Sequence, residues 1–536
     1  MVVIREAVQD ISVRFGSRFI DRVKEFSRII GFSVEADDEV TVEFNPDRHD
    51  LFSFISLDHM QNLYFDTHKE RIPVFKNDVS LLEQETAVKS VREFIVGFTA
   101  DGPKIAKDLN RLIDFQEKLH LSVGRNRKSV SIGLHDASKL SPPFTLKAME
   151  SESIEFETYD GAVKGTAREI IEKHPKGKEY GNLVPDLLRV AILLDSSGKV
   201  LSMPPLINGK DSIVTEETSH FLVDITGNSL PSIRAVLFDL AYLFHYLGYS
   251  VKLHFTDSKV AEYFSSHNGR QITVSKDQID QILGIELSLG EISSILERMG
   301  YGVSFRESFL IRVPGNRSDV MGPVDIIEDI AKGRGYDSIP SKKPLAQVIG
   351  SELPVRRFQN GMRDLLLGLG YQETMSYVVT SSSLYEGSEY DGKISIENPK
   401  SLDFSVVRDR LYLNMLDFLR LNKSRSLPQR TFEIGDVIQE GEQKTHLCIA
   451  AIHNRANYSE IRSTVEYILK RLGNVKMEVT DSFNPHFIPG RSGIIMHNGR
   501  SIGYLGEVNP GTLVKFELQN PVVVAEINLE MFLAQR

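Results

Sequence analysis

The sequence predicts an α+β protein built from several domains, for three reasons. The chain has 536 residues, well beyond the ordinary domain length of roughly 100–200 residues. Apolar residues make up 41% and charged residues 25% of the chain, as in ordinary globular proteins. Segments with the two-residue alternation of strands and segments with helical spacing are interspersed along the whole chain.

Residues 1–82 are predicted to form an N-terminal α/β domain. Apolar residues at helical spacing predict a helix over residues 20–30, and alternation over residues 40–44 predicts a strand. Asp50 is predicted to cap a further helix that begins at Leu51.

Residues 83–268 are predicted to form an α+β domain. A hairpin signal joins two strand patterns over residues 189–202, and a helix over residues 230–247 lies between two more strands. Loops rich in glycine and proline on such a scaffold are where ligand sites tend to lie. These loops are residues 141–144, 204–209 and 226–228.

Residues 269–345 resemble a winged helix-turn-helix module in their pattern. Capping boxes at Ser275 and Ser288 begin two short helices, and a hairpin over residues 302–313 follows. Such modules often hold nucleic acid, but the same fold also serves as a plain scaffold. The second helix has one clear basic residue, Arg298, so we do not expect it to read a DNA groove.

Residues 346–536 begin with a helical pattern over residues 358–369. Several strand patterns follow, so we expect an antiparallel sheet with flanking helices. The main strands are predicted at residues 430–438, 447–452, 492–497 and 522–527.

The pattern with the clearest chemistry is a group of four carboxylates: Asp319, Asp325, Glu328 and Asp329. The last three lie at i, i+3 and i+4 of a helix that Pro323 should begin. On an exposed helix, like charges at this spacing repel by about 0.2–0.5 kcal/mol per pair. A Mg²⁺ ion would reverse that sign, since it prefers oxygen ligands. The alternative, favoured by the residues alone, is an acidic first turn that complements the helix dipole.

The composition excludes several classes of function. With 63 basic and 73 acidic residues the net charge is −10, which argues against a free-standing basic nucleic-acid binder. The single cysteine, Cys448, excludes an intramolecular disulfide and a multi-cysteine zinc site, and is more typical of a buried apolar position. No signal peptide and no membrane-spanning segment is predicted, so we expect a soluble, cytoplasmic protein.

Two weaker signals favour ordinary turns over active sites. The basic run at residues 124–128 is more typical of a solvated turn than of a phosphate site. His135 beside Asp136 has the residue types of acid–base catalysis, but an isolated pair is more typical of a turn.

Read together, a series of segments resembles the beta-subunit family of phenylalanyl-tRNA synthetases, in its shorter archaeal and eukaryotic form. The order and spacing of the segments carry this resemblance. They are residues 42–53, 130–136, 142–144, 203–209, 214–218, 316–336, 432–437, 489–492 and 503–508.

The resemblance implies a heterotetramer of two alpha and two beta chains that charges tRNA(Phe) with phenylalanine, using ATP and Mg²⁺. In that family the alpha chain carries the aminoacylation centre, and the beta chain ends in an inactive class II-like core. Phe432 and Glu433 look like a relic of a class II strand motif. The glycine-rich strand and helix with an ATP-binding arginine are not recognisable here, so no adenylate chemistry is assigned to this chain.

The resemblance also implies two sites. The family's magnesium ligands match Asp319, Asp325, Glu328 and Asp329, in a site shared with the alpha chain. Residues 83–268 resemble the editing domain, also called B3/B4, which hydrolyses Tyr-tRNA(Phe). Bacterial relatives place an acidic residue where this chain has Lys210, so Asp211 would have to substitute from the next position. The editing candidates are Asn208, Asp211, Glu216, Glu217 and Thr226.

Two alternatives remain open at this point. One is a non-enzymatic scaffold subunit that only holds alpha chains together. The other is a stand-alone deacylase that acts on free mischarged tRNA.

Overall fold

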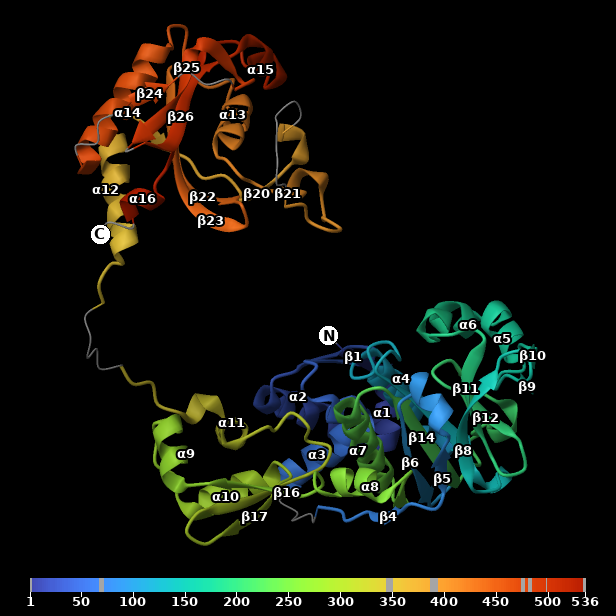
Figure 1. Ribbon diagram of the computed structural model, residues 1–536. Helices are drawn as coiled ribbons and strands as arrows, with labels where there is room; N and C mark the ends of the chain where they lie inside the picture. The colour runs from blue at the N-terminus through green and yellow to red at the C-terminus, as the bar shows by residue number, and fades with distance from the viewer. Residues whose placement is uncertain are drawn as a thin grey trace. The chain divides into compact units, whose positions relative to one another are not determined.

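The computed structural model describes residues 2–66, 72–343, 350–385, 394–473, 478–480, 484–497 and 499–533. The chain forms two compact units, Met1–Lys343 and Pro344–Arg536 (Figure 1). Both units contain helices and sheets, which confirms the mixed α+β, multidomain class. The finer division into four domains stays a prediction.

The chain begins with a three-stranded antiparallel sheet in the order β1 (Val2–Ala7), β3 (Glu39–Phe44) and β2 (Ser33–Ala36). Helices α1 (Val8–Phe15) and α2 (Phe19–Ile30) connect β1 to β2. The predicted start of the next helix was wrong: α3 spans Phe54–Asp66. Asp50 is not its cap, because both carboxylate oxygens accept hydrogen bonds from Arg48 at 2.8 Å.

Two five-stranded sheets follow. The first has the order β4 (Lys76–Asp78), β15 (Ser250–Phe255), β6 (Phe94–Asp101), β14 (His220–Gly227) and β7 (Val130–Asp136). The second has the order β13 (Ile207–Asn208), β12 (Val200–Met203), β11 (Arg189–Leu194), β8 (Phe144–Glu150) and β5 (Leu82–Gln84). Neighbours are antiparallel, except the parallel pairs β15–β4 and β8–β5.

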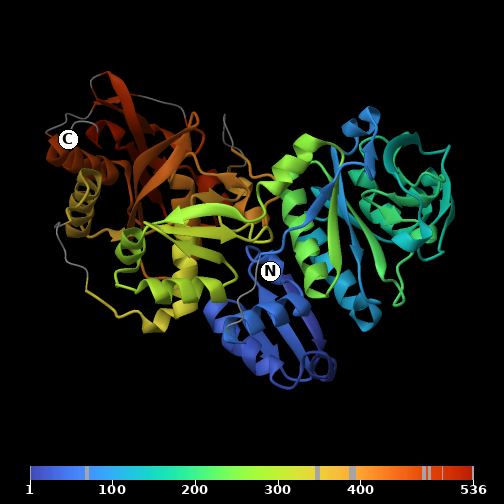
Figure 2. The ribbon, with the colours of Figure 1, turned by 90° about the horizontal axis from the view of Figure 1, so that it is seen from below.

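The two sheets and their helices form layers, because successive side chains of a strand point to opposite faces of its sheet. On β6, Val96 and Phe98 join the core with helices α4 (Leu109–Leu121) and α7 (Leu230–Tyr246). Figure 2 shows the light-green helix α7 running along the strands of the first sheet. Ile95 points to the other face and packs with Leu193 of the second sheet. Helix α5 (Ala167–Lys173) covers the far face of the second sheet.

The predicted helix-turn-helix pattern is present in the next segment. Both capping boxes form, at Ser275 before α9 (Lys276–Leu283) and at Ser288 before α10 (Leu289–Arg298). Strands β17 (Gly302–Phe305) and β18 (Phe309–Val313) follow the helices. They form a sheet with β16 (Arg270–Val274), which precedes the helices, in the order β16, β18, β17. Helix α11 (Pro323–Arg334) packs on α10 through Gly333, where a Cβ would lie 2.7 Å from Cγ2 of Ile295.

The second unit is built on a seven-stranded sheet. Its order is β19 (Gln372–Glu373), β22 (Gln429–Gln439), β23 (Glu442–Ile452), β27 (Val522–Asn528), β26 (Arg500–Val508), β25 (Phe487–His497) and β24 (Glu478–Thr480). Ile449 faces α12 (Pro354–Gly368) and α14 (Tyr458–Gly473). Cys448 faces α13 (Tyr412–Leu421) on the other side, so the thiol is buried as predicted.

Shorter elements complete the two units. They are β9 (Glu155–Glu157), β10 (Lys164–Thr166), α6 (Pro175–Tyr180), α8 (Ser258–Ser265), β20 (Val379–Thr380), β21 (Val406–Val407), α15 (Pro510–Lys515) and α16 (Glu530–Leu533). Within the described ranges, no helix is both long and apolar enough to cross a membrane.

Candidate functional site

Two of the four predicted magnesium ligands, Asp319 and Asp329, form ion pairs with the same buried arginine, Arg317. Arg317 donates from Nε and Nη2 to Asp319, at 2.9 and 2.8 Å, and from Nη2 to Asp329 at 2.6 Å. The Tyr301 hydroxyl donates to the same Asp329 oxygen at 2.6 Å. Burial by itself would raise the pKa of Asp319, but the Arg317 guanidinium holds it well below its usual range. Both carboxylates therefore already have a positive partner.

The other two predicted ligands have different roles. The Asp325 carboxylate accepts hydrogen bonds from the backbone N–H groups of Met321 and Gly322, both at 2.8 Å, and so caps α11. Glu328 is exposed and forms an ion pair with Lys332 at 3.0 Å. Across the described ranges, no three His, Cys, Asp or Glu side chains lie together as a metal site requires. The four carboxylates, as placed in this chain, do not form a complete magnesium site.

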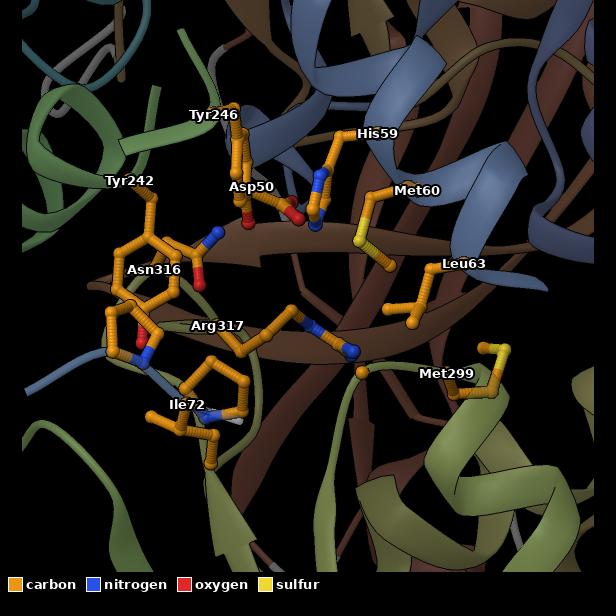
Figure 3. A pocket seen from close by; sticks show the side chains of 13 residues that line it. Asp50, His59, Met60, Leu63, Ile72, Tyr242, Tyr246, Met299, Asn316 and Arg317 are labelled. Atoms are coloured by element: carbon orange, nitrogen blue, oxygen red, sulfur yellow. The ribbon is translucent and has the colours of Figure 1, made fainter. Parts of the chain in front are cut away.

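The Arg317 cluster is joined to the N-terminal segment and to α7. His49 contacts Asp239 through Nδ1 and the Ser318 hydroxyl through Nε2, at 2.5 and 2.7 Å. Figure 3 shows Arg317 beside a small cavity at this junction. The volume of this cavity is about 30 Å³. Arg317 Nη1 and Asn316 Oδ1 are buried there without a hydrogen-bond partner among the described residues. The junction therefore joins three segments of the first unit.

A larger cavity, of about 150 Å³, lies beside the two five-stranded sheets. Its wall is mostly apolar, with a few polar and charged groups, as is typical of ligand pockets. Helix α4, strand β7 and the loop that follows β12 supply most of the wall. The lining residues are Leu109, Ile113, Gln116, Glu117, Arg127, Ile132, Leu134, Tyr159, Lys176, Leu206, Ile207, Asn208, Gly209, Ser212, Ile213 and Val214.

One of the five editing candidates lines this cavity. Asn208 does, and its Nδ2 donates to the Leu134 carbonyl at 3.3 Å. Asp211 and Glu216 are exposed and outside this wall. Glu217 is also exposed and forms an ion pair with Lys104. Thr226 is buried and shares a hydrogen bond with Ser131 at 2.9 Å, away from the cavity.

A buried hydrogen-bonded chain that the sequence did not predict ends at the same cavity. The His135 Nε2 lies 2.7 Å from Asp224 Oδ2, and Nδ1 lies 2.8 Å from the hydroxyl oxygen of Ser212. His135 is completely buried, and Ser212, itself buried, is one of the residues that line the cavity. Asp136, the other half of the sequence pair, accepts from the Ser138 N–H in a turn, as predicted. Ser212 and Asp224 lie 77 and 89 positions from His135 in the sequence, so no local motif indicates these contacts.

The sheet of the second unit carries buried charges that are internally paired. Arg408 Nη1 donates to Glu433 Oε1 at 2.8 Å, and both side chains are 2% exposed. Glu526 accepts from the backbone N–H of Leu411, from the Tyr504 hydroxyl and from His446. Glu433, predicted as a relic of a class II motif, thus has an internal partner.

Comparison with known proteins matches both units. Residues 272–336 match the tRNA synthetase B5 domain, and residues 339–529 match the phenylalanyl tRNA synthetase beta chain CLM domain. Two phenylalanine–tRNA ligase beta subunits are similar over the whole chain. That of Thermoplasma volcanium is 38% identical (100% of each chain), and that of Thermoplasma acidophilum is 36% identical (100% of this chain, 99% of that one).

A solved structure supports the same relationship. The crystal structure of an N-terminal fragment of the phenylalanyl-tRNA synthetase beta subunit from Pyrococcus horikoshii is 28% identical. It covers 62% of this chain and 100% of the fragment, with a TM-score of 0.55. The chain is thus a subunit of an aminoacyl-tRNA synthetase, a ligase of protein biosynthesis. More particularly, it belongs to the phenylalanyl-tRNA synthetase beta chain family, whose enzyme attaches phenylalanine to tRNA.

Proposed function

We propose that, besides its part in phenylalanine–tRNA ligase, this chain hydrolyses Tyr-tRNA(Phe) at the 150 Å³ cavity. A phenylalanine pocket cannot exclude every near-isostere by apolar packing, so a second, hydrolytic site improves accuracy. The observation that supports the proposal most is Ser212, a residue that lines a largely apolar cavity and whose hydroxyl is hydrogen-bonded to a buried imidazole.

The geometry suits a serine nucleophile. The Asp224 carboxylate accepts the Nε2–H of His135, which leaves the Nδ1 lone pair free to accept the Ser212 proton. Ser212 Oγ attacks the ester carbonyl, its proton moves to Nδ1, and the ester bond to the ribose breaks as the ribose oxygen takes that proton. Water then cleaves the acyl–serine ester by the same proton route and releases tyrosine.

The assembly is proposed to be the alpha2beta2 tetramer, acting on tRNA(Phe) with ATP in the cytoplasm. The second unit exposes several large apolar side chains, which a partner chain would cover. Met375 is 90% exposed, Leu402 80% and Tyr377 76%. The sedimentation mass of the purified alpha–beta complex tests this stoichiometry.

Magnesium binding by Asp319, Asp325, Glu328 and Asp329 stays a prediction. Because Arg317 occupies two of these carboxylates, Mg²⁺ at this edge would need further oxygen ligands from the alpha chain. Glu328, the most exposed of the four, is the natural first contact for such a shared ion. The prediction can be tested by Mg²⁺ titration of tetramer formation.

The deciding experiment is hydrolysis of purified Tyr-tRNA(Phe) by the reconstituted complex. Because Ser212 is the proposed nucleophile, we expect Ser212→Ala to slow hydrolysis by at least the roughly 10²–10⁴-fold that general acid–base assistance contributes, with phenylalanine charging retained. A tyrosyl adduct at Ser212 after rapid quench, detected by mass spectrometry, would identify the nucleophile. No hydrolysis by the unaltered complex would instead favour the non-enzymatic scaffold, and hydrolysis by a stable monomer would favour the stand-alone deacylase.

A further inference from the structure

Lys176 lines the 150 Å³ cavity and has no direct anionic partner among the described residues. It lies near the start of α6, and its Nζ is 5.1 Å from the centroid of the Tyr159 ring, which lines the same cavity. Within the described part of the chain, Nζ has no hydrogen bond and no ion pair. Two exposed lysines nearby are paired: Lys173 with Glu169, and Lys210 with Glu157.

The backbones of Lys176 and Tyr159 are fixed by one shared hydrogen-bonded group. The Asp160 carboxylate accepts from the Thr158 hydroxyl at 2.7 Å and from His174 Nε2 at 3.0 Å. His174 Nδ1 in turn accepts the Lys176 backbone N–H at 3.1 Å. Because Asp160 directly follows Tyr159 in the chain, these bonds place the lysine and the ring together before any ligand arrives.

The nearby carboxylate of Glu117 makes its direct contacts with groups other than Lys176. Glu117 receives two hydrogen bonds from Arg127, at 2.9 and 3.3 Å, and one contact from His120 at 3.3 Å. Burial by itself would raise the pKa of Glu117, but His120, Arg127 and, to a smaller degree, the charge of Lys176 lower it to about 2. The direct hydrogen bonds of this carboxylate come from Arg127 and His120. Arg127 is also engaged by the Leu206 carbonyl at 3.0 Å. Lys176 therefore carries the unpaired positive charge of this cluster.

We propose that Lys176, seated on the Tyr159 ring, binds the phosphate of the terminal nucleotide that carries the tyrosyl ester. This positioning role rests on the proposed editing function and specifies which part of the substrate the charged wall receives. The ester must reach Ser212 in the same cavity, and a nucleotide that delivers it brings one phosphodiester close to the acyl group. A phosphate would give Nζ a charge-assisted partner, and Tyr159 offers a face for the base or ribose.

The experiment uses the reconstituted alpha–beta complex and two stable ligands. Both carry tyrosine in amide linkage at the 3′ position of 3′-deoxyadenosine, and one of them also has a 5′-phosphate. A hydrogen bond to a charged group contributes about 1.5–3 kcal/mol, so we expect the phosphate to strengthen binding by tenfold or more. Lys176→Met should abolish this gain, and Lys176→Arg should keep most of it. Lys173→Met, which removes an exposed lysine from the neighbouring helix α5, should keep all of it.

The outcomes separate this proposal from the editing function itself. An equal phosphate gain in the unaltered complex and in Lys176→Met would overturn the proposal, as would the absence of any gain in the unaltered complex. Any binding of these ligands to the alpha chain is the same in both complexes, so it does not affect the comparison between them. Hydrolysis of Tyr-tRNA(Phe) is measured separately, so its absence would remove the editing function while the binding comparison still decides the role of Lys176.

Discussion

His49 Nδ1 lies 2.5 Å from Asp239 Oδ2, which joins the segment before α3 to the middle of α7 across 190 positions of sequence. Burial by itself would lower the pKa of His49, but the Asp239 carboxylate outweighs it and raises the pKa to about 9. Burial raises the pKa of Asp239 to about 6, so both groups are charged between these values.

This pair predicts a pH-dependent stability. The stabilisation that accompanies the raised pKa of His49 is fully present below the unfolded pKa of 6.5, and it is lost as the pH rises through about 9. The shift corresponds to about 3 kcal/mol at most. We expect the free energy of unfolding of the first unit to fall between pH 6.5 and 9, measured by urea denaturation. His49→Asn should flatten this slope, while His220→Asn, at an exposed site, should keep it; the same slope in both would contradict the prediction.

Arg317 is predicted to be essential for the stability of the first unit. Breaking a buried ion pair by removing one partner costs about 3–5 kcal/mol, because the remaining charge is left buried without compensation. Arg317→Met leaves Asp319 and Asp329 in that state, so the midpoint of urea unfolding should fall strongly. Arg306→Met, on the exposed hairpin between β17 and β18, should change it little. Equal midpoints for the two variants would show that the cluster does not stabilise the fold.

The magnesium prediction can be tested at Asp325 and Glu328, the two predicted ligands that are not paired with Arg317. Asp325→Ala combined with Glu328→Ala should weaken Mg²⁺-dependent tetramer formation or phenylalanine charging. Because Asp325 also caps α11, the single change Glu328→Gln separates metal loss from a lost cap. Unchanged assembly and charging across a Mg²⁺ titration would contradict the assignment of these residues as magnesium ligands. Glu307→Gln, an exposed change outside the cluster, serves as the control.

Local features of this fold were predictable from the sequence, whereas long-range polar contacts were not. The capping boxes at Ser275 and Ser288 involve residues three apart, so they can be recognised in the sequence directly. Asp50 was misassigned because its carboxylate binds the neighbouring Arg48 instead of a helix N–H. His135 and Ser212 come from distant segments that meet only when the strands assemble, so the family resemblance could locate the domain but not this pair.

In the second unit, the Arg408–Glu433 pair is predicted to be structural. Glu433→Ala leaves a buried guanidinium without its carboxylate, which should cost about 3–5 kcal/mol. Replacing both partners with methionine should recover much of this loss, because well-packed apolar pairs often substitute for buried ion pairs. Phenylalanine charging per assembled tetramer should stay constant while the melting temperature changes. A fall in charging at unchanged stability would instead give Glu433 a role in the synthetic reaction.

The final prediction separates two buried residues on one strand, β14. Asp224 fixes the His135 tautomer that can accept the Ser212 proton, and an asparagine there can instead donate to Nε2 and reverse that tautomer. Asp224→Asn should therefore slow Tyr-tRNA(Phe) hydrolysis by about 10²–10⁴-fold, with phenylalanine charging retained. Thr226→Val is the matched change two residues along, and it removes a hydroxyl bonded to Ser131 outside the cavity wall. Its deacylation rate should stay close to that of the unaltered complex. If Thr226→Val lost hydrolysis and Asp224→Asn kept it, the candidate drawn from the sequence would replace the buried chain as the hydrolytic machinery.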